Sequence, residues 1–197
     1  MRLFAAVRPA GPALDHLESA LAAVGPGHGQ LRWTVRENWH VTLAFYGEVP
    51  EGAVDELAAG LERLTADSPS PRLVLRGAAV FSGRTLWVGT GGELAELVAL
   101  CHGAREVGAE VLGRAEERER VRPHLTVGRQ LPSGRQSARR GRVRGEADEV
   151  ARALAVYEGP AWDATEVLLV RSQPGRGAHG GPLYEDLFAF PLGRAGA

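Results

Sequence analysis

Residues 123–129 read Pro-His-Leu-Thr-Val-Gly-Arg, and residues 39–45 carry nearly the same pattern, Trp-His-Val-Thr-Leu-Ala-Phe. Each segment holds a His-x-Thr triplet among β-branched and aliphatic residues, a composition that favours a β-strand. Side chains alternate between the two faces of a strand, so each histidine shares a face with its threonine while the apolar residues point the other way. Each segment is therefore predicted to be a strand with an apolar back and a polar front.

A small residue follows each triplet on the predicted polar front. Ala44 and Gly128 stand where a bulky side chain would crowd whatever the histidine and threonine contact. Tyr46 would share the face of His40 in a regular strand. Two such fronts brought together would form a cleft carrying two imidazoles, two hydroxyls and open space.

The surroundings of the two triplets repeat at a constant offset. The two histidines are 84 residues apart (124 − 40), and so are the two threonines (126 − 42). An apolar strand candidate, followed by a helical pattern, precedes each triplet by just under forty residues, at 3–7 and at 85–89. One His-x-Thr alone is usually a surface pair or a satisfied core pair, but a repeat with its flanks indicates internal duplication. We expect residues 1–197 to form a single domain of two duplicated lobes, each with one triplet.

Composition is ordinary for a water-soluble globular protein, and it disfavours a disulfide-linked, a secreted or a membrane-spanning protein. The net charge is −1, so any attraction for phosphate must be local. The single cysteine, Cys101, cannot form an internal disulfide and is expected in the core. The N-terminal residues contain no long apolar run, which predicts no signal peptide, no membrane span and a cytoplasmic location.

The order of elements is mixed rather than strictly alternating, which predicts an α+β fold with antiparallel sheets. Alternating and aliphatic runs predict strands at 1–7, 31–35, 40–46, 73–81, 85–88, 121–129, 167–171 and 187–190. Apolar residues at helical spacing predict helices over 14–24, 50–64, 94–112 and 150–156.

Two other motifs are weaker than they look. Residues 175–180 satisfy the Gly-x-Gly-x-x-Gly pattern of dinucleotide-binding folds, but Gly181-Pro182 follows where a helix would have to begin. A loop at the rim of the cleft is the better interpretation. His40 and His124 lack a third ligand at metal-binding spacing, so no metal and no cofactor are expected.

The chain resembles the two-histidine (2H) phosphoesterases, and within them the bacterial and archaeal RNA 2′,3′-cyclic phosphodiesterases, also called 2′-5′ RNA ligases. The resemblance covers almost the whole chain, although Gly128 stands where this family more often has Ala and Trp39 where Leu is common. Segments 1–4, 38–43, 45–49, 86–89, 122–129, 169–172, 184–185 and 190–192 carry it.

The resemblance implies two α/β lobes around a V-shaped central groove, and hydrolysis of RNA 2′,3′-cyclic phosphate ends to 2′-phosphomonoesters. Imidazoles suit both proton transfers because their unperturbed pKa is about 6.5. By family analogy His40 is the proton donor and His124 the proton acceptor, although pseudo-symmetry alone cannot assign this polarity. Thr42 and Thr126 would bind the phosphate oxygens.

Further roles stay open at this point. Arg129 would contact phosphate or make a structural ion pair, and Tyr46 would stack a base or pack in the core. The arginines within 135–144 would steer RNA or form a solvated loop. The expected partner is RNA with a 2′,3′-cyclic end, bound by a monomer, with reversible 2′-5′ ligation as a further activity. The alternatives are a 2H enzyme for small cyclic nucleotides or ADP-ribose cyclic phosphate, and a non-catalytic RNA-end-binding protein.

Overall fold

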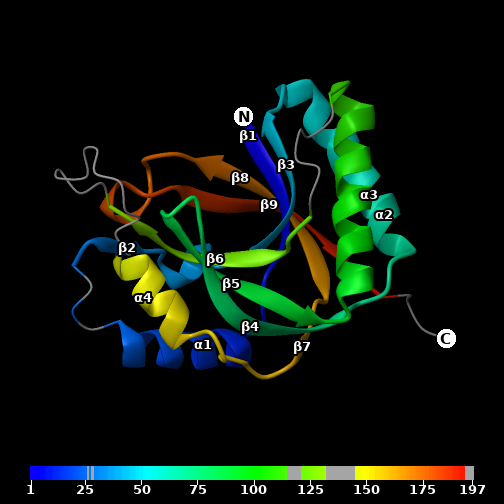
Figure 1. The fold of residues 1–197 in the computed structure, drawn as a ribbon. Coiled ribbons are helices and arrows are strands. Elements are labelled where there is room, and N and C mark those ends of the chain that lie inside the picture. Colours follow the sequence, from blue (N-terminus) through cyan, green and yellow to red (C-terminus); the bar gives the residue numbers. More distant parts are fainter. Residues whose placement is uncertain (26, 28, 115–120, 132–144, 194–197) are drawn as a thin grey trace.

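Antiparallel pairing joins the strands of the computed structural model into one curved sheet (Figure 1). The structure describes residues 1–25, 27, 29–114, 121–131 and 145–193. The strand order is β7-β4-β5-β6-β3-β1-β8-β9, and the short β2 pairs with β6. The predicted α+β fold with antiparallel pairing is confirmed, and the structure adds that both halves share a single sheet.

The elements follow one another in the order of the chain. They are β1 (Arg2–Val7), α1 (Gly11–Val24), β2 (Leu31–Trp33), η1 (Arg36–Asn38), β3 (Val41–Glu48), η2 (Glu51–Ala53), α2 (Val54–Ala66), β4 (Arg72–Phe81), β5 (Thr85–Gly92), α3 (Leu94–Leu112), β6 (His124–Gln130), α4 (Glu146–Ala153), β7 (Trp162–Asp163), β8 (Glu166–Gln173), η3 (Ala178–Gly180) and β9 (Leu183–Pro191).

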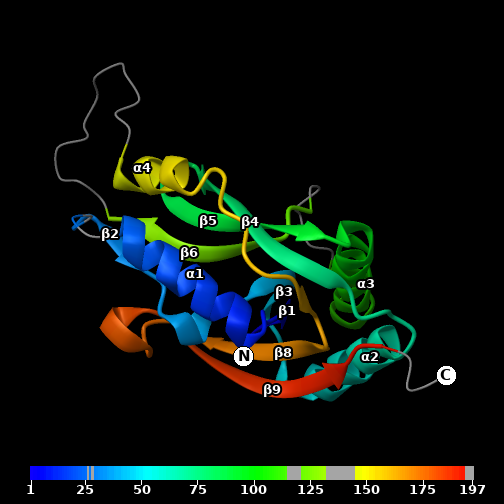
Figure 2. The same cartoon turned by 90° about the horizontal axis from the view of Figure 1, so that it is seen from below.

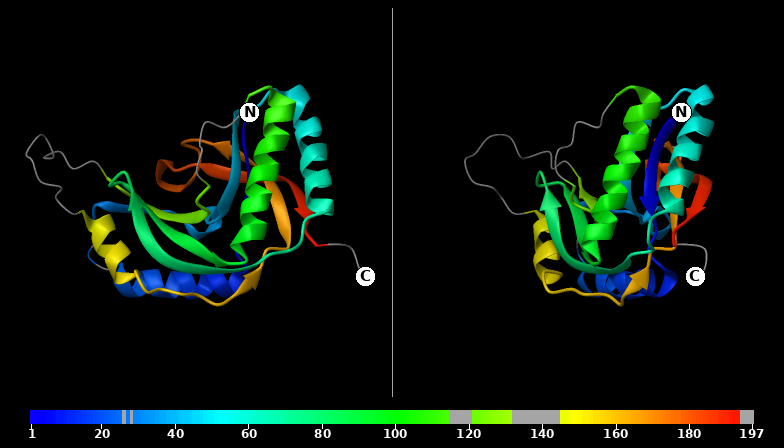
Figure 3. Two further views of the ribbon diagram at one scale, coloured as in Figure 1. Left: turned by 45° about the vertical axis from the view of Figure 1, so that its right-hand side comes forward. Right: turned by 90° about the vertical axis from the view of Figure 1, so that its right-hand side faces the viewer.

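Helices cover the outer side of each arm of the sheet. α1 and α4 lie along the arm that contains β4, β5 and β6, whereas α2 and α3 stand beside β3, β8 and β9 (Figures 2 and 3). The apolar faces of these helices join one continuous core with the backs of the strands. Because the helices occupy the outer side of both arms, they leave the inner side of the curve uncovered.

The two arms meet where β3 lies beside β6. In the described part of the chain these strands share a single registered pair, Val41 opposite Leu125, and both side chains are fully buried. Further along, β3 continues with β1 as its partner, whereas β6 continues with β2 and β5. The two strands therefore diverge from this one contact, and a groove opens between them.

The boundaries of some elements differ from the sequence predictions. The last helix, predicted over 150–156, spans Glu146–Ala153, because Gly145 and Asp148 form a cap before the apolar residues begin. β9 begins at Leu183 rather than 187, and β7 has no counterpart among the predicted strands. Residues 135–144 lie outside the described residues. Among the helices that are described, none is long and apolar enough to cross a membrane.

Candidate active site

An extra residue interrupts the ladder just after each His-x-Thr triplet. In β3, Ala6 pairs with Thr42 and Ala5 with Ala44, which leaves Leu43 as the bulged residue. In β6, Trp87 pairs with Thr126 and Leu86 with Gly128, which leaves Val127 in the same position. A β-bulge places two residues opposite one and so resets which face the following side chains point to. Both triplets are therefore followed by the same change of face.

The bulges correct the expectation for Ala44 and Gly128. Both residues are buried on the core side rather than lying on the polar front. The next position turns outward instead: Phe45 is 46% exposed, and Arg129 is also exposed. Both side chains line the groove, five residues after His40 and His124 respectively. The same geometry therefore supplies an aromatic ring on one side and a cation on the other.

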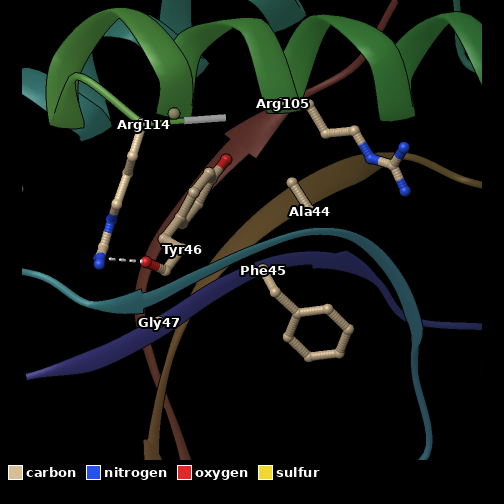
Figure 4. A pocket seen from close by; sticks show the side chains of 7 residues that line it. Ala44, Phe45, Tyr46, Gly47, Arg105 and Arg114 are labelled. Atoms are coloured by element: carbon tan, nitrogen blue, oxygen red, sulfur yellow. Dashed lines mark hydrogen bonds between the residues drawn. The ribbon is translucent and has the colours of Figure 1, made fainter. Parts of the chain in front are cut away.

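The expected common face of His40 and Tyr46 is wrong, because a second bulge in β3 lies at Tyr46 itself. Tyr46 is 5% exposed, and its hydroxyl donates a hydrogen bond to the carbonyl of Ala104 on α3 at 3.1 Å. Figure 4 shows Tyr46 pointing toward α3 and Phe45 pointing away from it. Core packing is thus the role that the structure gives Tyr46, and its neighbour Phe45 lines the groove instead.

The single β3–β6 pair brings the four polar side chains together. Extending the antiparallel register by one residue sets Thr42 beside His124 and His40 beside Thr126. Val41 and Leu125 point into the core, so their polar neighbours point to the opposite side, and all four line the groove. An antiparallel pair has a local twofold axis, and each histidine is thereby matched with the threonine of the other strand.

Each histidine side chain is held by a hydrogen bond to the backbone two residues before it. Nδ1 of His40 lies 2.8 Å from the carbonyl oxygen of Asn38, and Nδ1 of His124 lies 2.7 Å from that of Arg122. A carbonyl oxygen only accepts, so Nδ1 carries the hydrogen in both rings. Nε2 is then the nitrogen that gains or gives a proton, as a base or an acid in this groove requires.

Aromatic rings fix the planes of both imidazoles. His40 lies 4.8 Å from the ring of Phe4 and 5.2 Å from that of Tyr184, between centroids. His124 lies 4.9 Å from Phe81 in an edge-to-face contact. Sequence reasoning did not find these partners, because they come from β1, β4 and β9, far from either triplet.

Burial lowers the pKa of His40 from 6.5 to about 4. The hydrogen bond to Asn38 opposes this shift, whereas the positive charges of Arg8 and His124 add to it. His40 is therefore neutral at pH 7 in the free protein. The shared register and the common groove place the two imidazoles in the same space.

The groove is strongly basic although the chain as a whole is not. It has a volume of about 1150 Å³ and holds both histidines and both threonines. Among the described residues that line it there is no aspartate or glutamate. Its arginines are Arg2, Arg32, Arg105, Arg122 and Arg129. Guanidinium groups suit phosphate oxygens in geometry and charge, so the groove is suited to an anionic ligand.

One wall of the groove is the loop between β8 and β9. It contains residues 175–180, which confirms their predicted place at the rim, and the three-residue η3 is not a helix that could receive a pyrophosphate. The amide of Asn38 donates to the carbonyl of Pro182 at 3.0 Å, which ties this wall to the segment that holds His40. The described part of the chain contains no cluster of three metal-ligating side chains.

A smaller hollow of about 240 Å³ lies between β3 and α3. Arg114 donates hydrogen bonds from Nη2 to the backbone carbonyls of Tyr46, at 2.7 Å, and Glu48 (Figure 4). These bonds provide partners for two β3 carbonyls beyond the point where β3 pairs with β6. Arg105 lines both this hollow and the main groove. Neither arginine was singled out as a candidate from the sequence.

The lowered pKa of His40 predicts a specific acid sensitivity of folding. The unfolded chain binds a proton at this position below about pH 6.5 but the folded protein only below about pH 4, so stability falls as the pH drops through that window. His40→Asn keeps an N–H for the Asn38 carbonyl but does not titrate. Between pH 7 and pH 5, wild type should lose about 1–2 kcal/mol more unfolding free energy than the variant.

Urea unfolding at the two pH values measures this difference. His102→Asn, which removes an exposed imidazole from α3, is the matched control. Parallel losses in wild type and His40→Asn would contradict the assigned pKa of His40.

Comparisons with known proteins agree with this geometry. Residues 7–87 match the family model described as LigT like Phosphoesterase. A Geobacillus stearothermophilus protein named RNA 2′,3′-cyclic phosphodiesterase is 30% identical over 81% of this chain, which spans about half (47%) of that relative's length. A Methanothermobacter thermautotrophicus protein of the same name is 29% identical over 90% of this chain and 91% of its own.

A solved structure from Thermus thermophilus has the same fold over the full length. It superposes with a TM-score of 0.76 at 26% sequence identity and covers 100% of both chains. The family-model match, the full-length likeness of fold and the paired histidine triplets agree with one another: the chain is similar to the LigT-like phosphoesterases in sequence over residues 7–87 and in fold over its whole length.

Proposed function

We propose that this protein opens the 2′,3′-cyclic phosphate at the end of an RNA to give a 2′-phosphomonoester, by acid–base catalysis between His40 and His124. The observation that carries the proposal is the pairing of two Nδ1-anchored imidazoles around one backbone pair, inside a groove lined by arginines. The names of the two relatives support the same substrate class.

The proposed reaction needs one proton accepted and one donated. Nε2 of His124 takes a proton from water as the water oxygen attacks phosphorus. The bond from phosphorus to the 3′ oxygen breaks, and Nε2 of His40 gives that oxygen a proton. Thr42 and Thr126 donate hydrogen bonds to the non-bridging oxygens, where negative charge grows in the transition state. A 5′-hydroxyl in place of water would give a 2′-5′ linkage with the same groups.

Charge in the groove controls when His40 can act. Because burial lowers its pKa to about 4, His40 does not hold a proton in the free protein at neutral pH. The negative charge of a bound phosphate raises the pKa of His40, so substrate binding favours the protonated imidazole that acts as the acid. A neutral imidazole is also what a base requires, and the opposite polarity is therefore the second candidate.

Arg129 is the cation that the proposal places at the phosphate. It lies on the same face as His124 and Thr126, because the bulge at Val127 turns it there. The matching position after the first triplet holds Phe45, which also lines the groove, so only the second strand supplies a cation at this position.

Replacing either histidine should lower the rate without unfolding the protein, because both side chains line the groove rather than the core. His40→Ala and His124→Ala are each expected to lower kcat by about 10²–10⁴ on an RNA with a 2′,3′-cyclic end, the usual contribution of general acid–base catalysis. The double variant should fall well short of the product of the two losses, because the pair acts as a unit. Thr42→Ala and Thr126→Ala should cost about 10- to 150-fold.

Turnover is measured by separating the 2′-phosphate product from a 3′-phosphate standard. His102→Ala on α3, outside the groove, is the control and should keep wild-type activity. A folded His124→Ala protein that works at near wild-type rate would place the chemistry elsewhere.

Since imidazoles and hydroxyls supply every step proposed here, catalysis should not need a divalent cation. Full activity is expected after exhaustive treatment with EDTA and dialysis. Loss of turnover that one particular divalent ion restores would show that a metal takes part in the reaction.

A further inference from the structure

The groove does not end at the two histidines. The smaller hollow between β3 and α3 shares Phe45, Gly47 and Arg105 with the groove, so the two spaces adjoin. Gly47 presents no side chain at the passage between them. A ligand anchored at the histidines can therefore extend along β3 into this second space.

Phe45 offers an exposed aromatic surface at that passage. Nearly half of it is exposed (46%), although an apolar ring of this size gains free energy when it is covered. Its ring lies 6.1 Å from that of Phe4, which in turn lies 4.8 Å from His40. The ring of Phe4 therefore lies between His40 and Phe45, which places Phe45 further from the reacting phosphate than Phe4 is. An exposed aromatic ring beside a basic groove is a typical platform for a nucleic-acid base.

Arg105 supplies positive charge at the same place. It comes from α3, which packs against β3. Its side chain lines both the groove and the smaller hollow, and Figure 4 shows it extending from α3 past Ala44. Among the described residues, those that line the two spaces carry arginines and no acidic side chain.

We propose that Phe45 and Arg105 bind the nucleotide that precedes the cyclic end, Phe45 by stacking on its base and Arg105 by contacting its phosphodiester. The inference rests on the proposed function. It commits the protein to RNA chains of two or more nucleotides in preference to cyclic mononucleotides. A lone cyclic nucleotide reaches the histidines but leaves this subsite empty.

The test compares two substrates that differ only in the preceding nucleotide: adenosine 2′,3′-cyclic phosphate and the dinucleotide ApA with the same cyclic end. The variants are Phe45→Ala, Phe45→Trp and Arg105→Gln. Phe188→Ala on β9 and Arg72→Gln on β4 are matched controls, because they remove an exposed ring and an exposed guanidinium outside both spaces.

Phe45→Ala should lower kcat/KM for the dinucleotide by about 5- to 150-fold, the range of a lost base–aromatic stack. Its kcat/KM for the mononucleotide should stay within about twofold of wild type, which also shows that the variant is folded. Phe45→Trp keeps a stacking surface and should retain the activity on the dinucleotide. Arg105→Gln should reduce the slope of log(kcat/KM) against log[salt] by about 0.7 on the dinucleotide only.

Equal losses on both substrates would overturn the inference, because Phe45 and Arg105 would then act at the reacting nucleotide. Wild-type rates on both substrates would overturn it as well. If wild type opened neither cyclic phosphate, the proposed function would fail, and that outcome is distinct from the other two.

Discussion

One backbone pairing, Val41 against Leu125, determines the geometry of the whole site. Within the described residues it is the only registered pair between β3 and β6, and it therefore fixes how two segments more than eighty residues apart in the chain lie on each other. A shift by one residue would turn both histidines into the core and bury two unpaired imidazoles. The burial of Val41 and Leu125 makes that shift unfavourable. Stability of the core and alignment of the polar groups thus depend on the same contact.

The two bulges are placed symmetrically, but the side chains that they turn into the groove are different. They occur at matching positions, Leu43 and Val127, and each turns the fifth residue after its histidine into the groove. The residues that they present differ, however, since Phe45 is apolar and Arg129 is charged. We infer that the two lobes arose by duplication, a proposal supported by the shared offset, register, bulge and Nδ1 anchor. The backbone is therefore arranged symmetrically around the groove, whereas the side chains on its two sides differ and would contact different parts of a substrate.

The sequence was most informative where local pattern decides structure. The strands and helices followed from alternation and helical spacing, and the triplets with their flanks led to the family resemblance. The groove-lining threonines and Arg129 were found because they belong to the triplets or directly flank them. The face of Tyr46 was missed because a bulge depends on how two strands pair, which neither strand reveals alone. Arg105 was not singled out because its place beside the groove depends on how α3 packs against β3, which the sequence of α3 alone does not show.

The central claim is that His40 and His124 form an acid–base pair acting on one phosphate. It is tested most directly with a cyclic end in which sulfur replaces the 3′ oxygen, because a thiolate leaves without protonation (thiol pKa about 8.5). We predict that His40→Ala regains most of its lost rate on the sulfur substrate, whereas His124→Ala stays slow. Rescue of His124→Ala alone would reverse the polarity of the pair. If neither variant were rescued, the claim that one imidazole protonates the leaving oxygen would be contradicted.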